Sequence, residues 1–569
     1  MAGHNLKRDV VEFLPAVILA NFALILAYII LYVNTRLISV DQLMWMLPLL
    51  LFVTLSGIIA LFVINFDAIR RQFQPISRST WTFLIIILLV GAYLRVFVAP
   101  HTHRIFFDED IYMDVGNSIA SEGRALLCNY GTPEKCVEGI LNKEPNGYPV
   151  LVAALYLIFG RDEQSVFIFE TLLGIATIAV VFLTAYLVFE RDDTALYTAL
   201  LFALMPSHII WSTSVGAELI SIFFILVTLL AFLIFFRAPT LRMQLLATLS
   251  AVYAIQVRPE NGLLLGVMAV MFLVFDKKLT DRLKSPSFYI PWFVLALLIT
   301  PHLIHLAYAA RTDTWGASEG KLGLKYIDYN LPINTRFWYD NNMHPAFFTL
   351  LAIAGLVLLA VYDTRKFTFL LTWFLAYHIL YIVFYSGSFT SGGIGTRFAL
   401  IVSTPALFFG GYCISKVSDF AKEGYRRAIT AVLVTLILIS FYPLIGFIKS
   451  PDMQAQYARE KHDFVLSHID EIDPSCYTLT HNPNIFLING RSALQTWFGQ
   501  NRRVMQDVYG KTDCVLFLEG AWCLWEPHKS GVCKYMKDNY NLTVMWRLVR
   551  ENNPDQVFTI YKVSKPLNY

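Results

Sequence analysis

Three consecutive carboxylates, Asp108, Glu109 and Asp110, lie just beyond the apolar run 81–99. Carboxylates at a membrane boundary repel one another and resist dehydration, so they are costly unless something uses them. A carboxylate that is held close to an acceptor hydroxyl and partly removed from water can take its proton. The alternative is a solvated turn that caps a helix starting near Ile111. We favour a general base in this segment.

Four further charged residues, Glu218, Arg258, Glu260 and Arg397, lie near the ends of later apolar runs. Arginine suits phosphate oxygens because its guanidinium is a permanently charged, bidentate fork. Carboxylates and arginines on one face of a bilayer would form a site for a lipid phosphate with a reactive headgroup. Two alternatives stay open: Glu218 bonds only to hydroxyls such as Ser214, and the arginines only pair with Glu260 or snorkel to lipid headgroups.

Two histidines, His101 and His103, precede the acidic triplet. Together with carboxylates, Asp110 among them, they form a candidate set for a divalent metal ion. Histidines at a membrane interface are ordinary, however, and an acid such as Asp110 also suits the first turn of a helix. No cofactor is predicted with certainty, and a divalent metal ion is left open.

These residues stand in a chain whose composition is that of an integral membrane protein. Hydrophobic residues make up 56% of the 569 residues and charged residues only 15%, far from the usual balance of a soluble domain. About thirteen apolar runs have lengths near those that a bilayer requires. They cover residues 13–33, 43–64, 81–99, 165–189, 194–211, 217–236, 243–257, 261–275, 288–308, 346–362, 367–386, 398–415 and 428–448.

The distribution of positive charge predicts the orientation of these spans. If the N-terminus is cytoplasmic and the spans alternate, eighteen Lys and Arg residues fall in cytoplasmic segments, and three, at Arg36, Arg258 and Arg397, fall in short outer loops. This is a strong positive-inside signal. It predicts a multi-pass protein of the plasma (cytoplasmic) membrane, with the acidic triplet, the loop 309–345 and the tail after residue 448 outside the cytoplasm.

The cysteines agree with this topology. Six of the seven fall on the outer side, and an even number there suits disulfides. A zinc cluster or free thiols are the alternative, but the spacings contain no CxxC pair. We predict one local disulfide in the first outer loop and two in the tail, formed by Cys128, Cys136, Cys476, Cys514, Cys523 and Cys533.

Three domains are predicted: an N-terminal hairpin of spans over 1–80, a catalytic membrane domain over 81–448 and an extracytoplasmic domain over 449–569. The membrane domain carries large outer loops at 100–164 and 309–345. Within the first of them, the run 148–160 is too short to cross a bilayer and is predicted to be a helix in the interface. In the tail, strand-like stretches lie between helical stretches such as 454–469 and 529–539, so we predict a small α/β domain. The strand-like stretches are Cys476–Thr480, Cys514–Leu518, Leu542–Leu548 and Val557–Val563.

Over about residues 81–415, the chain resembles the GT-C membrane glycosyltransferases, in particular the branch with protein O-mannosyltransferases and lipid A aminoarabinose transferases. The resemblance rests on an Asp-Glu-x-x-Tyr-like motif that ends at Tyr112, and on a Gly-Tyr-Pro … Leu-x-Phe-Gly segment over Gly147–Gly160. A second acid at Glu218, and Arg397-Phe398 followed by Pro405, complete it. The implied fold is mostly α-helical, with many membrane spans.

The resemblance also implies roles for residues. Asp108 would be the base, with Glu109 beside it, and Glu218 would be the partner acid in the next outer loop. Arg258 and Arg397 would contact phosphate, with Lys143 as an outlying candidate. The chain departs from the family where Lys143 is not followed by two prolines and where Phe398 replaces the more usual tyrosine. Tyr112 and Glu260 are added as candidates for substrate binding.

The leading hypothesis is an inverting glycosyltransferase that moves a monosaccharide from a polyprenyl-phosphate donor, such as a dolichyl-phosphate mannose, to an extracytoplasmic protein, lipid or glycan. The runner-up is a transporter or flippase of a lipid-linked sugar. A third hypothesis is a receptor-like protein whose tail binds partners, in which deletion of residues 450–569 abolishes all function while a transferase would keep partial activity. Bulk charge, at a net +3, suggests no nucleic-acid partner.

Overall fold

The computed structural model describes residues 38–105, 107–312, 320–390, 394–450, 456–520, 523, 527–550 and 553–564. The chain forms two compact units. The first, the helical unit, contains residues 1–102 and 167–454. The second, the mixed unit, contains residues 103–166 and 455–569. The predicted span 13–33 lies outside the described residues.

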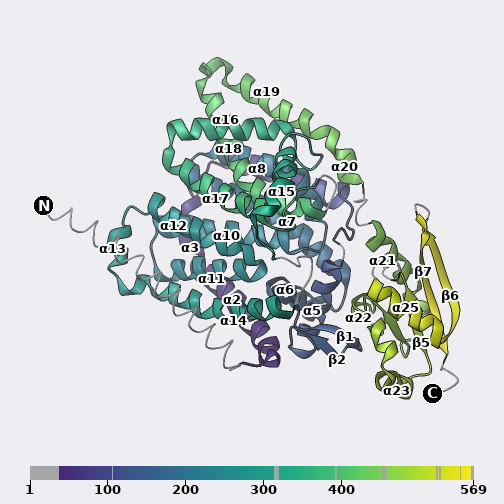
Figure 1. Cartoon of the computed structure of the whole chain (residues 1–569). Coiled ribbons are helices and arrows are strands. Elements are labelled where there is room, and N and C mark those ends of the chain that lie inside the picture. The colour runs from purple at the N-terminus through teal and green to yellow at the C-terminus, as the bar shows by residue number, and fades with distance from the viewer. Residues whose placement is uncertain are drawn as a thin grey trace. The chain divides into compact units, whose positions relative to one another are not determined.

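The helical unit is built from apolar helices (Figure 1). Among the described residues, eight helical stretches are long and apolar enough to cross a membrane, and each coincides with a predicted apolar run. The main helices of these stretches are α2 (Val40–Ile64), α4 (Arg78–Tyr93), α7 (Glu163–Phe189), α10 (Ala217–Arg237), α14 (Ile290–Thr312), α17 (Thr364–Val383), α18 (Ala399–Phe420) and α19 (Glu423–Phe441). The predicted polytopic, mostly α-helical fold is confirmed.

The remaining predicted runs form shorter helices. They are α8 (Asp192–Ala203) with α9 (Pro206–Trp211), α11 (Leu241–Val257), α12 (Leu264–Phe275) and α16 (Ala346–Tyr362). Pro206 explains the break in the first of these runs, since a proline is tolerated at the start of a helix but not in its interior. The number of thirteen spans is therefore not confirmed.

Helix α18 is the buried centre of the helical unit. It is apolar or small on all sides, as expected for a fully enclosed helix, and its residues from Ala399 to Ser415 are all buried. Glycines allow its close contacts: a Cβ on Gly355 of α16 would lie 1.9 Å from the Phe409 carbonyl oxygen, and one on Gly411 would lie 2.1 Å from Thr198 Oγ1 of α8. Small residues at such crossings let helix backbones approach.

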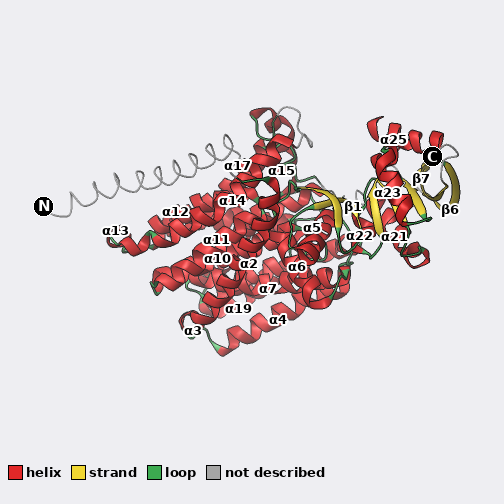
Figure 2. Ribbon diagram, turned by 90° about the horizontal axis from the view of Figure 1, so that it is seen from below, coloured by secondary structure: helices red, strands yellow, loops and turns green. Residues whose placement is uncertain are grey.

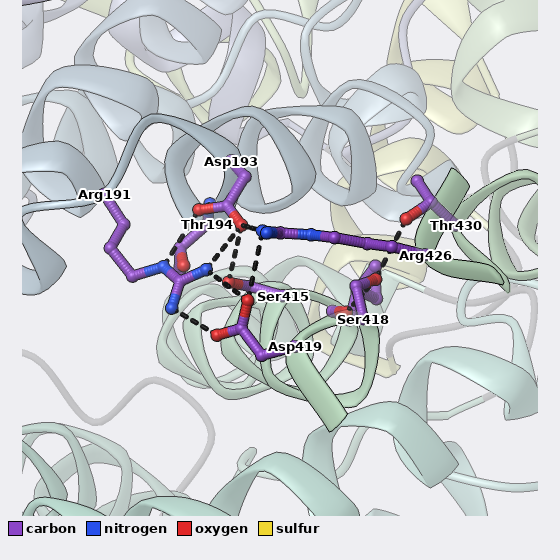
Figure 3. Close-up of polar contacts among 9 residues, drawn as sticks. Arg191, Asp193, Thr194, Ser415, Ser418, Asp419, Arg426 and Thr430 are labelled. Carbon is purple, nitrogen blue, oxygen red and sulfur yellow. Dashed lines mark hydrogen bonds and ion pairs between the residues drawn. The ribbon is translucent and has the colours of Figure 1, made fainter. Parts of the chain in front are cut away.

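An ionic network joins α8, α18 and α19 near the C-terminal end of α18 (Figure 3). Arg191 donates to Asp193 at 2.7 Å and to Asp419 at 2.5 Å, and Arg426 lies 3.0 Å from Asp419. Ser415 donates to Asp193 at 2.9 Å. The network ties the start of α8 to the end of α18 and the start of α19, in segments that the charge distribution assigns to the cytoplasmic side.

The predicted apolar run 81–99 contains a charged residue. Arg95, in a short π-helical segment at Leu94–Val98, is fully buried and donates through Nη1 to the carbonyl oxygens of Gly91, at 3.1 Å, and Ala203, at 3.3 Å. A buried guanidinium is costly unless it is hydrogen-bonded. The run is apolar on average, so its mean hydropathy does not reveal this charged residue.

The mixed unit is built on a seven-stranded sheet, whose order is β2-β1-β4-β3-β5-β7-β6. Figure 2 draws the strands in yellow and the helices in red. Strands β4 (Ser492–Gln495), β3 (Tyr477–Thr480) and β5 (Val515–Glu519) are parallel, and the outer pairs are antiparallel. The flanking strands are β1 (Leu127–Gly131), β2 (Cys136–Ile140), β6 (Asn541–Arg550) and β7 (Asn553–Ser564). Four of these strands match the strand-like stretches predicted in the tail.

The sheet joins two distant parts of the sequence. Strands β1 and β2 come from the first large loop, and β1 pairs with β4 of the tail at Tyr130↔Leu494. Tyr130 also packs in the core of the unit with Tyr477, Leu479 and Phe517. Helices of the unit include α5 (Asp108–Glu122), α6 (Gly147–Phe159), α21 (Gln456–His468), α22 (Asn484–Ile488), α23 (Arg502–Lys511) and α25 (Pro527–Asn539).

Three disulfides lie in the mixed unit, as the prediction of one local bridge and two tail bridges requires; the pairing within the tail was not predicted. One closes the β1–β2 hairpin, Cys128–Cys136, and two lie in the tail, Cys476–Cys514 and Cys523–Cys533. The run predicted as an interfacial helix is α6, a helix of thirteen residues. Its first half is buried, while Leu157, Ile158 and Phe159 at its end are exposed, so an apolar tip is available to a membrane surface.

Candidate functional site

Four predicted residues come together in the helical unit and form what we call the arginine–glutamate cluster: Glu218, Arg258, Glu260 and Arg397. Glu218 lies in the first turn of α10, and Arg258 follows the end of α11. Arg258 donates to Glu218 through Nη1 and to Glu260 through Nε. Arg397 Nε lies 3.3 Å from Glu218 Oε1. Glu218 thus contacts both guanidinium groups.

Burial strengthens these contacts. The Glu218 side chain is only 3% exposed, and those of Arg258 and Arg397 are 13% and 14% exposed. Two cations and two carboxylates balance in charge, which reduces the cost of placing them away from water. The arginines keep partial exposure, and the carboxylates fix their orientation.

Aromatic rings complete the arginine–glutamate cluster. The guanidinium carbons of Arg258 and Arg397 lie 5.3 Å and 5.0 Å from the centre of the Phe398 ring, close enough for cation–π attraction. Tyr381 stacks on Phe398 at 5.2 Å and donates its hydroxyl to Glu260 at 3.1 Å. Phe398 replaces the tyrosine that is usual in the resembled family, and it keeps the aromatic face that the arginines contact.

The segment that leads to Arg397 is held by a helix from the second large loop. In α15 (Ile327–Phe337), Asn330 Nδ2 donates to the carbonyl oxygens of Ile382, at 3.0 Å, and Phe384, at 2.7 Å. Asn334 donates to Gly387 and accepts from the Phe389 amide. A buried asparagine that satisfies several backbone groups fixes a loop as a turn does. The loop 309–345 therefore positions this chain segment.

The acidic triplet begins helix α5 of the mixed unit. Asp108 is the first residue of α5 and is half-buried, whereas Glu109 and Asp110 are buried. Phe107, which precedes it, has φ = 68°, a left-handed conformation that is uncommon for a bulky residue and that clusters at functional sites. The approach to Asp108 is therefore held in a strained form.

Glu109 anchors the segment before α5. Its Oε2 accepts hydrogen bonds from the backbone amides of Arg104, at 2.8 Å, and Ile105, at 3.0 Å, and lies 3.1 Å from His103 Nδ1. The side chain is 1% exposed. Burial lowers the pKa of His103, but Glu109 and Glu163 outweigh burial and raise it well above its usual value.

Asp110 is tied to the tail of the same unit. Asn482 donates to Asp110 Oδ2 at 2.7 Å. Lys461 is buried nearby, with its ammonium 4.8 Å from the centre of the Phe107 ring. Burial lowers the pKa of Lys461 to about 8, against the opposing effect of the Asp110 charge. Helix α5 and the residue before it thus contact residues of the tail for which the sequence predicted no role.

Comparison with known proteins places this geometry in context. Residues 143–305 match the family described as dolichyl-phosphate-mannose-protein mannosyltransferase. No curated protein sequence matches the chain. The structure of ArnT from Cupriavidus metallidurans bound to undecaprenyl phosphate aligns with a TM-score of 0.55 at 12% identity, over 85% of this chain and 98% of that one. The chain is similar to GT-C membrane glycosyltransferases.

A second solved GT-C protein has a similar fold. The oligosaccharyltransferase of Archaeoglobus fulgidus in the apo form aligns with a TM-score of 0.51 at 13% identity, over 87% of this chain and 76% of that one. The same archaeal protein has been solved with Zn and sulfate, at 14% identity and a TM-score of 0.50 over 85% of this chain and 74% of that one. The predicted GT-C-like fold is therefore confirmed.

Three more predicted site residues have contacts of their own within the helical or the mixed unit. Tyr112 is buried in α5 and packs edge-on against Tyr148 of α6 at 5.0 Å. Lys143 lies in the mixed unit, 4.0 Å from Glu144. His101, in the helical unit, hydrogen-bonds to Thr171 Oγ1 at 2.9 Å. Their predicted roles stay predictions.

Two groups of side chains have the spacing of metal ligands in the described part of the chain. His481, Cys523 and Cys533 form one, but these cysteines are bonded to each other, and a disulfide sulfur is not the thiolate that metals bind. His103, Glu163 and His462 form the other. Of the predicted metal candidates, His103 belongs to it, and neither His101 nor Asp110 does.

Proposed function

We propose that this protein is an inverting GT-C glycosyltransferase that moves a monosaccharide from a polyprenyl-phosphate donor to an extracytoplasmic protein, lipid or glycan. The observation that carries the proposal is the pair Arg258 and Arg397, oriented by one buried carboxylate and left partly exposed. ArnT from Cupriavidus metallidurans binds undecaprenyl phosphate, and an archaeal oligosaccharyltransferase has been solved with dolichol phosphate and an inhibitory peptide. The mannosyltransferase match favours a hexose over a pentose.

In this proposal Arg258 and Arg397 bind the donor phosphate through their guanidinium forks. The acceptor hydroxyl attacks the anomeric carbon on the face opposite the phosphate, and Asp108 takes the hydroxyl proton. The bond from the anomeric carbon to the phosphate oxygen breaks, and the lipid phosphate leaves with the electron pair. Since the leaving group is already an anion, stabilisation by the arginines matters more than protonation.

Two predicted catalytic residues receive other roles here. Glu218 was expected to act as a partner acid, but contacts with two arginines favour a positioning role. Glu109 accepts from two backbone amides and contacts His103, which favours a role in shaping the segment before Asp108. We keep Asp108 as the base because it is the only member of the triplet that is not buried.

The proposed location is the plasma (cytoplasmic) membrane, with the mixed unit outside the cytoplasm. Three disulfides in that unit support an oxidising side, and the positive-inside distribution of Lys and Arg supports the same orientation. Tyr112, Lys143 and Glu260 are proposed to contact substrate. A divalent metal ion is proposed on a set of residues that shares only His103 with the candidates indicated by the sequence.

The test uses the purified chain in detergent with dolichyl-phosphate-[14C]mannose and undecaprenyl-phosphate sugars as donor probes. We expect transfer of label to acceptor without any ion gradient, and Asp108→Asn should lower turnover by roughly 10²–10⁴-fold, the usual contribution of a general base. Asp340→Asn, at a surface aspartate whose side chain is 73% exposed, is the matched control. If no product forms in detergent, and the chain reconstituted into lipid vesicles moves the labelled donor across the membrane unchanged, the flippase hypothesis would instead be supported.

A further inference from the structure

The mixed unit contains a largely buried cluster of three side chains, which we call the His–Glu–His cluster: His103, Glu163 and His462. They come from the segment before α5, the start of α7 and the middle of α21. The side chains are 9%, 15% and 4% exposed. Neither the match to the mannosyltransferase family, which covers residues 143–305, nor the acidic triplet accounts for two histidines converging on this glutamate.

The distances within the cluster are those of ligands around one small cation. His103 Nε2 lies 3.2 Å from Glu163 Oε1, and His462 Nε2 lies 3.1 Å from Glu163 Oε2. All three ligand atoms lie within 4.8 Å of one another. Two ligand atoms that each sit about 2 Å from a tetrahedral Zn²⁺ are roughly 3.3 Å apart. The cluster therefore has the size of a three-ligand zinc site.

The surroundings of His103 match those of a metal-binding histidine. Its Nδ1 lies 3.1 Å from Glu109 Oε2, which also accepts from the Arg104 and Ile105 amides. A carboxylate behind the ring fixes the tautomer that presents Nε2 to a metal and makes that nitrogen more basic. Glu109 is thus placed as the outer partner in a carboxylate–histidine–metal arrangement.

Charge balance and access from solvent also favour a divalent cation in the His–Glu–His cluster. A divalent cation neutralises Glu163 and Glu109 while both imidazoles remain neutral ligands, so that no net charge is left buried. Glu163 also lines a cleft in the mixed unit, together with Arg161, Asp162, Gln164, Leu466, Ile488, Asn489 and Gly490. The cleft gives an ion or a water molecule a route to the cluster, and a fourth coordination position could be filled from it.

We propose that His103, Glu163 and His462 bind one divalent transition-metal ion, Zn²⁺ foremost, and that this ion fastens α21 of the tail to the segment that leads into α5. Two histidines and one carboxylate are a ligand set that zinc uses commonly. The site is structural in this proposal, because the two histidines are buried, Glu163 is only 15% exposed, and the ligands join the segment before α5 to a helix more than 300 residues later in the sequence. The inference does not depend on the glycosyltransferase assignment.

The first experiment measures metal content. The full chain is purified in detergent, dialysed against metal-free buffer, incubated with Zn²⁺, dialysed again and analysed by mass spectrometry for metal per chain. We expect about one equivalent of zinc in the wild type and at least a tenfold loss in His462→Ala and Glu163→Gln. The control is His468→Ala, on the same helix, where the histidine is partly exposed and pairs with Glu471; it should keep the full equivalent.

A second measurement covers variants that fail to fold. Co²⁺ added to the metal-free wild type should give visible d–d absorption without thiolate charge transfer, because the six outer cysteines form disulfides, and Zn²⁺ should displace it. A wild type that holds less than about 0.1 equivalent after incubation with Zn²⁺ would overturn the proposal. So would full zinc content in folded His462→Ala, since the imidazole would then not be a ligand.

Discussion

At the scale of single residues, Glu218 decides how the two arginines are presented. Its buried carboxylate contacts Arg258 and Arg397, and Glu218→Gln removes the charge while keeping the shape. Both guanidinium groups should then turn away from the geometry that suits a phosphate. Since a misplacement of about 1 Å can cost roughly 10²-fold in rate, we expect kcat/KM for the lipid donor to fall by about that factor.

The control for this change is Glu190→Gln. Glu190 also pairs with an arginine, Arg237, at 2.8 Å, but its side chain is 72% exposed. Ion pairs in water contribute little, so this variant should keep wild-type kinetics. Equal kinetics for Glu218→Gln and the wild type would show that the arginines are held by other contacts, and would remove the positioning role from Glu218.

Asp114 gives a prediction about pH. Burial raises its pKa to about 7, against the opposing hydrogen bonds from the Cys128 amide and Asn484. Because the folded pKa lies above the unfolded value of 3.8, the stabilisation is complete below pH 4 and is lost as the pH rises through 7. Asp114→Asn has no proton to lose and can still accept from the Cys128 amide.

Relative to the wild type, the free energy of unfolding of Asp114→Asn should therefore rise by roughly 2–4 kcal/mol between about pH 4 and pH 7. Above about pH 7 the difference between the two proteins should stay constant. Thermal unfolding of the purified chain across this range measures it. Asp538→Asn, at an exposed position of α25, should run parallel to the wild type. A difference for Asp114→Asn that does not change with pH would show that Asp114 stays ionised in the folded protein.

The sequence identified the charged residues of the site better than their partners. Glu218, Arg258 and Arg397 stood out because charges at the ends of apolar runs are rare, and the structure brings them together. Glu163 and His462 did not stand out, since each is an ordinary polar residue in its local pattern. These two residues approach His103 only because segments distant in the sequence pack together, and no local periodicity predicts that packing.

At the scale of elements, α18 depends on glycines at its helix crossings. A Cβ on Gly411 would lie 2.1 Å from Thr198 Oγ1 and 2.8 Å from the Thr198 backbone nitrogen. A backbone atom cannot rotate away as a side chain can, so α8 and α18 must separate. Gly411→Ala should destabilise the protein by about 1–3 kcal/mol, as overpacking of a core does, and lower the unfolding temperature in detergent.

Gly424→Ala is the matched control. Gly424 lies in α19, and a Cβ there would meet nothing within 4 Å. Alanine is the better helix former by about 1 kcal/mol, so this change should leave the unfolding temperature unchanged or raise it. If Gly411→Ala were as stable as Gly424→Ala, the contact between α8 and α18 would have room that the structure does not show.

The predicted elements and the observed ones agree where a local pattern decides. The described apolar runs form helices, and the stretches Cys476–Thr480 and Cys514–Leu518 form strands β3 and β5. Both strands are almost entirely buried, as central parallel strands are. Strands β1, β2 and β4 were not predicted. They are short, and their pairing depends on partners far away in the chain.

At the scale of the whole molecule, the mixed unit is assembled from two separate stretches of sequence. The first large loop supplies β1 and β2, and the tail supplies the other five strands. Tyr130 of β1 donates its hydroxyl to Asp507 of α23 at 2.6 Å and packs in the same core as residues of the tail. Loop 103–166 therefore completes its core only with residues 455–569.

This assembly changes what a deletion of the tail can show. Removal of residues 455–569 leaves β1 without its neighbour β4, exposes Tyr130 and takes Asn482 away from Asp110. Small strand pairs are unstable by themselves, so α5 and its acidic triplet should lose their positions. We expect the truncated chain to have no measurable transferase activity, and trypsin should cut rapidly within residues 124–143.

The outcome separates two views of the tail. Deletion of residues 565–569 alone, which lie outside the described residues, should preserve both activity and resistance to trypsin. If the chain without residues 455–569 kept partial turnover, α5 would be held in place without the sheet, and the tail would be an accessory domain. If it lost turnover while residues 124–143 stayed protected, the tail would act directly on a substrate. Loss of both together is what a single shared core requires, because folding of either stretch then depends on the other.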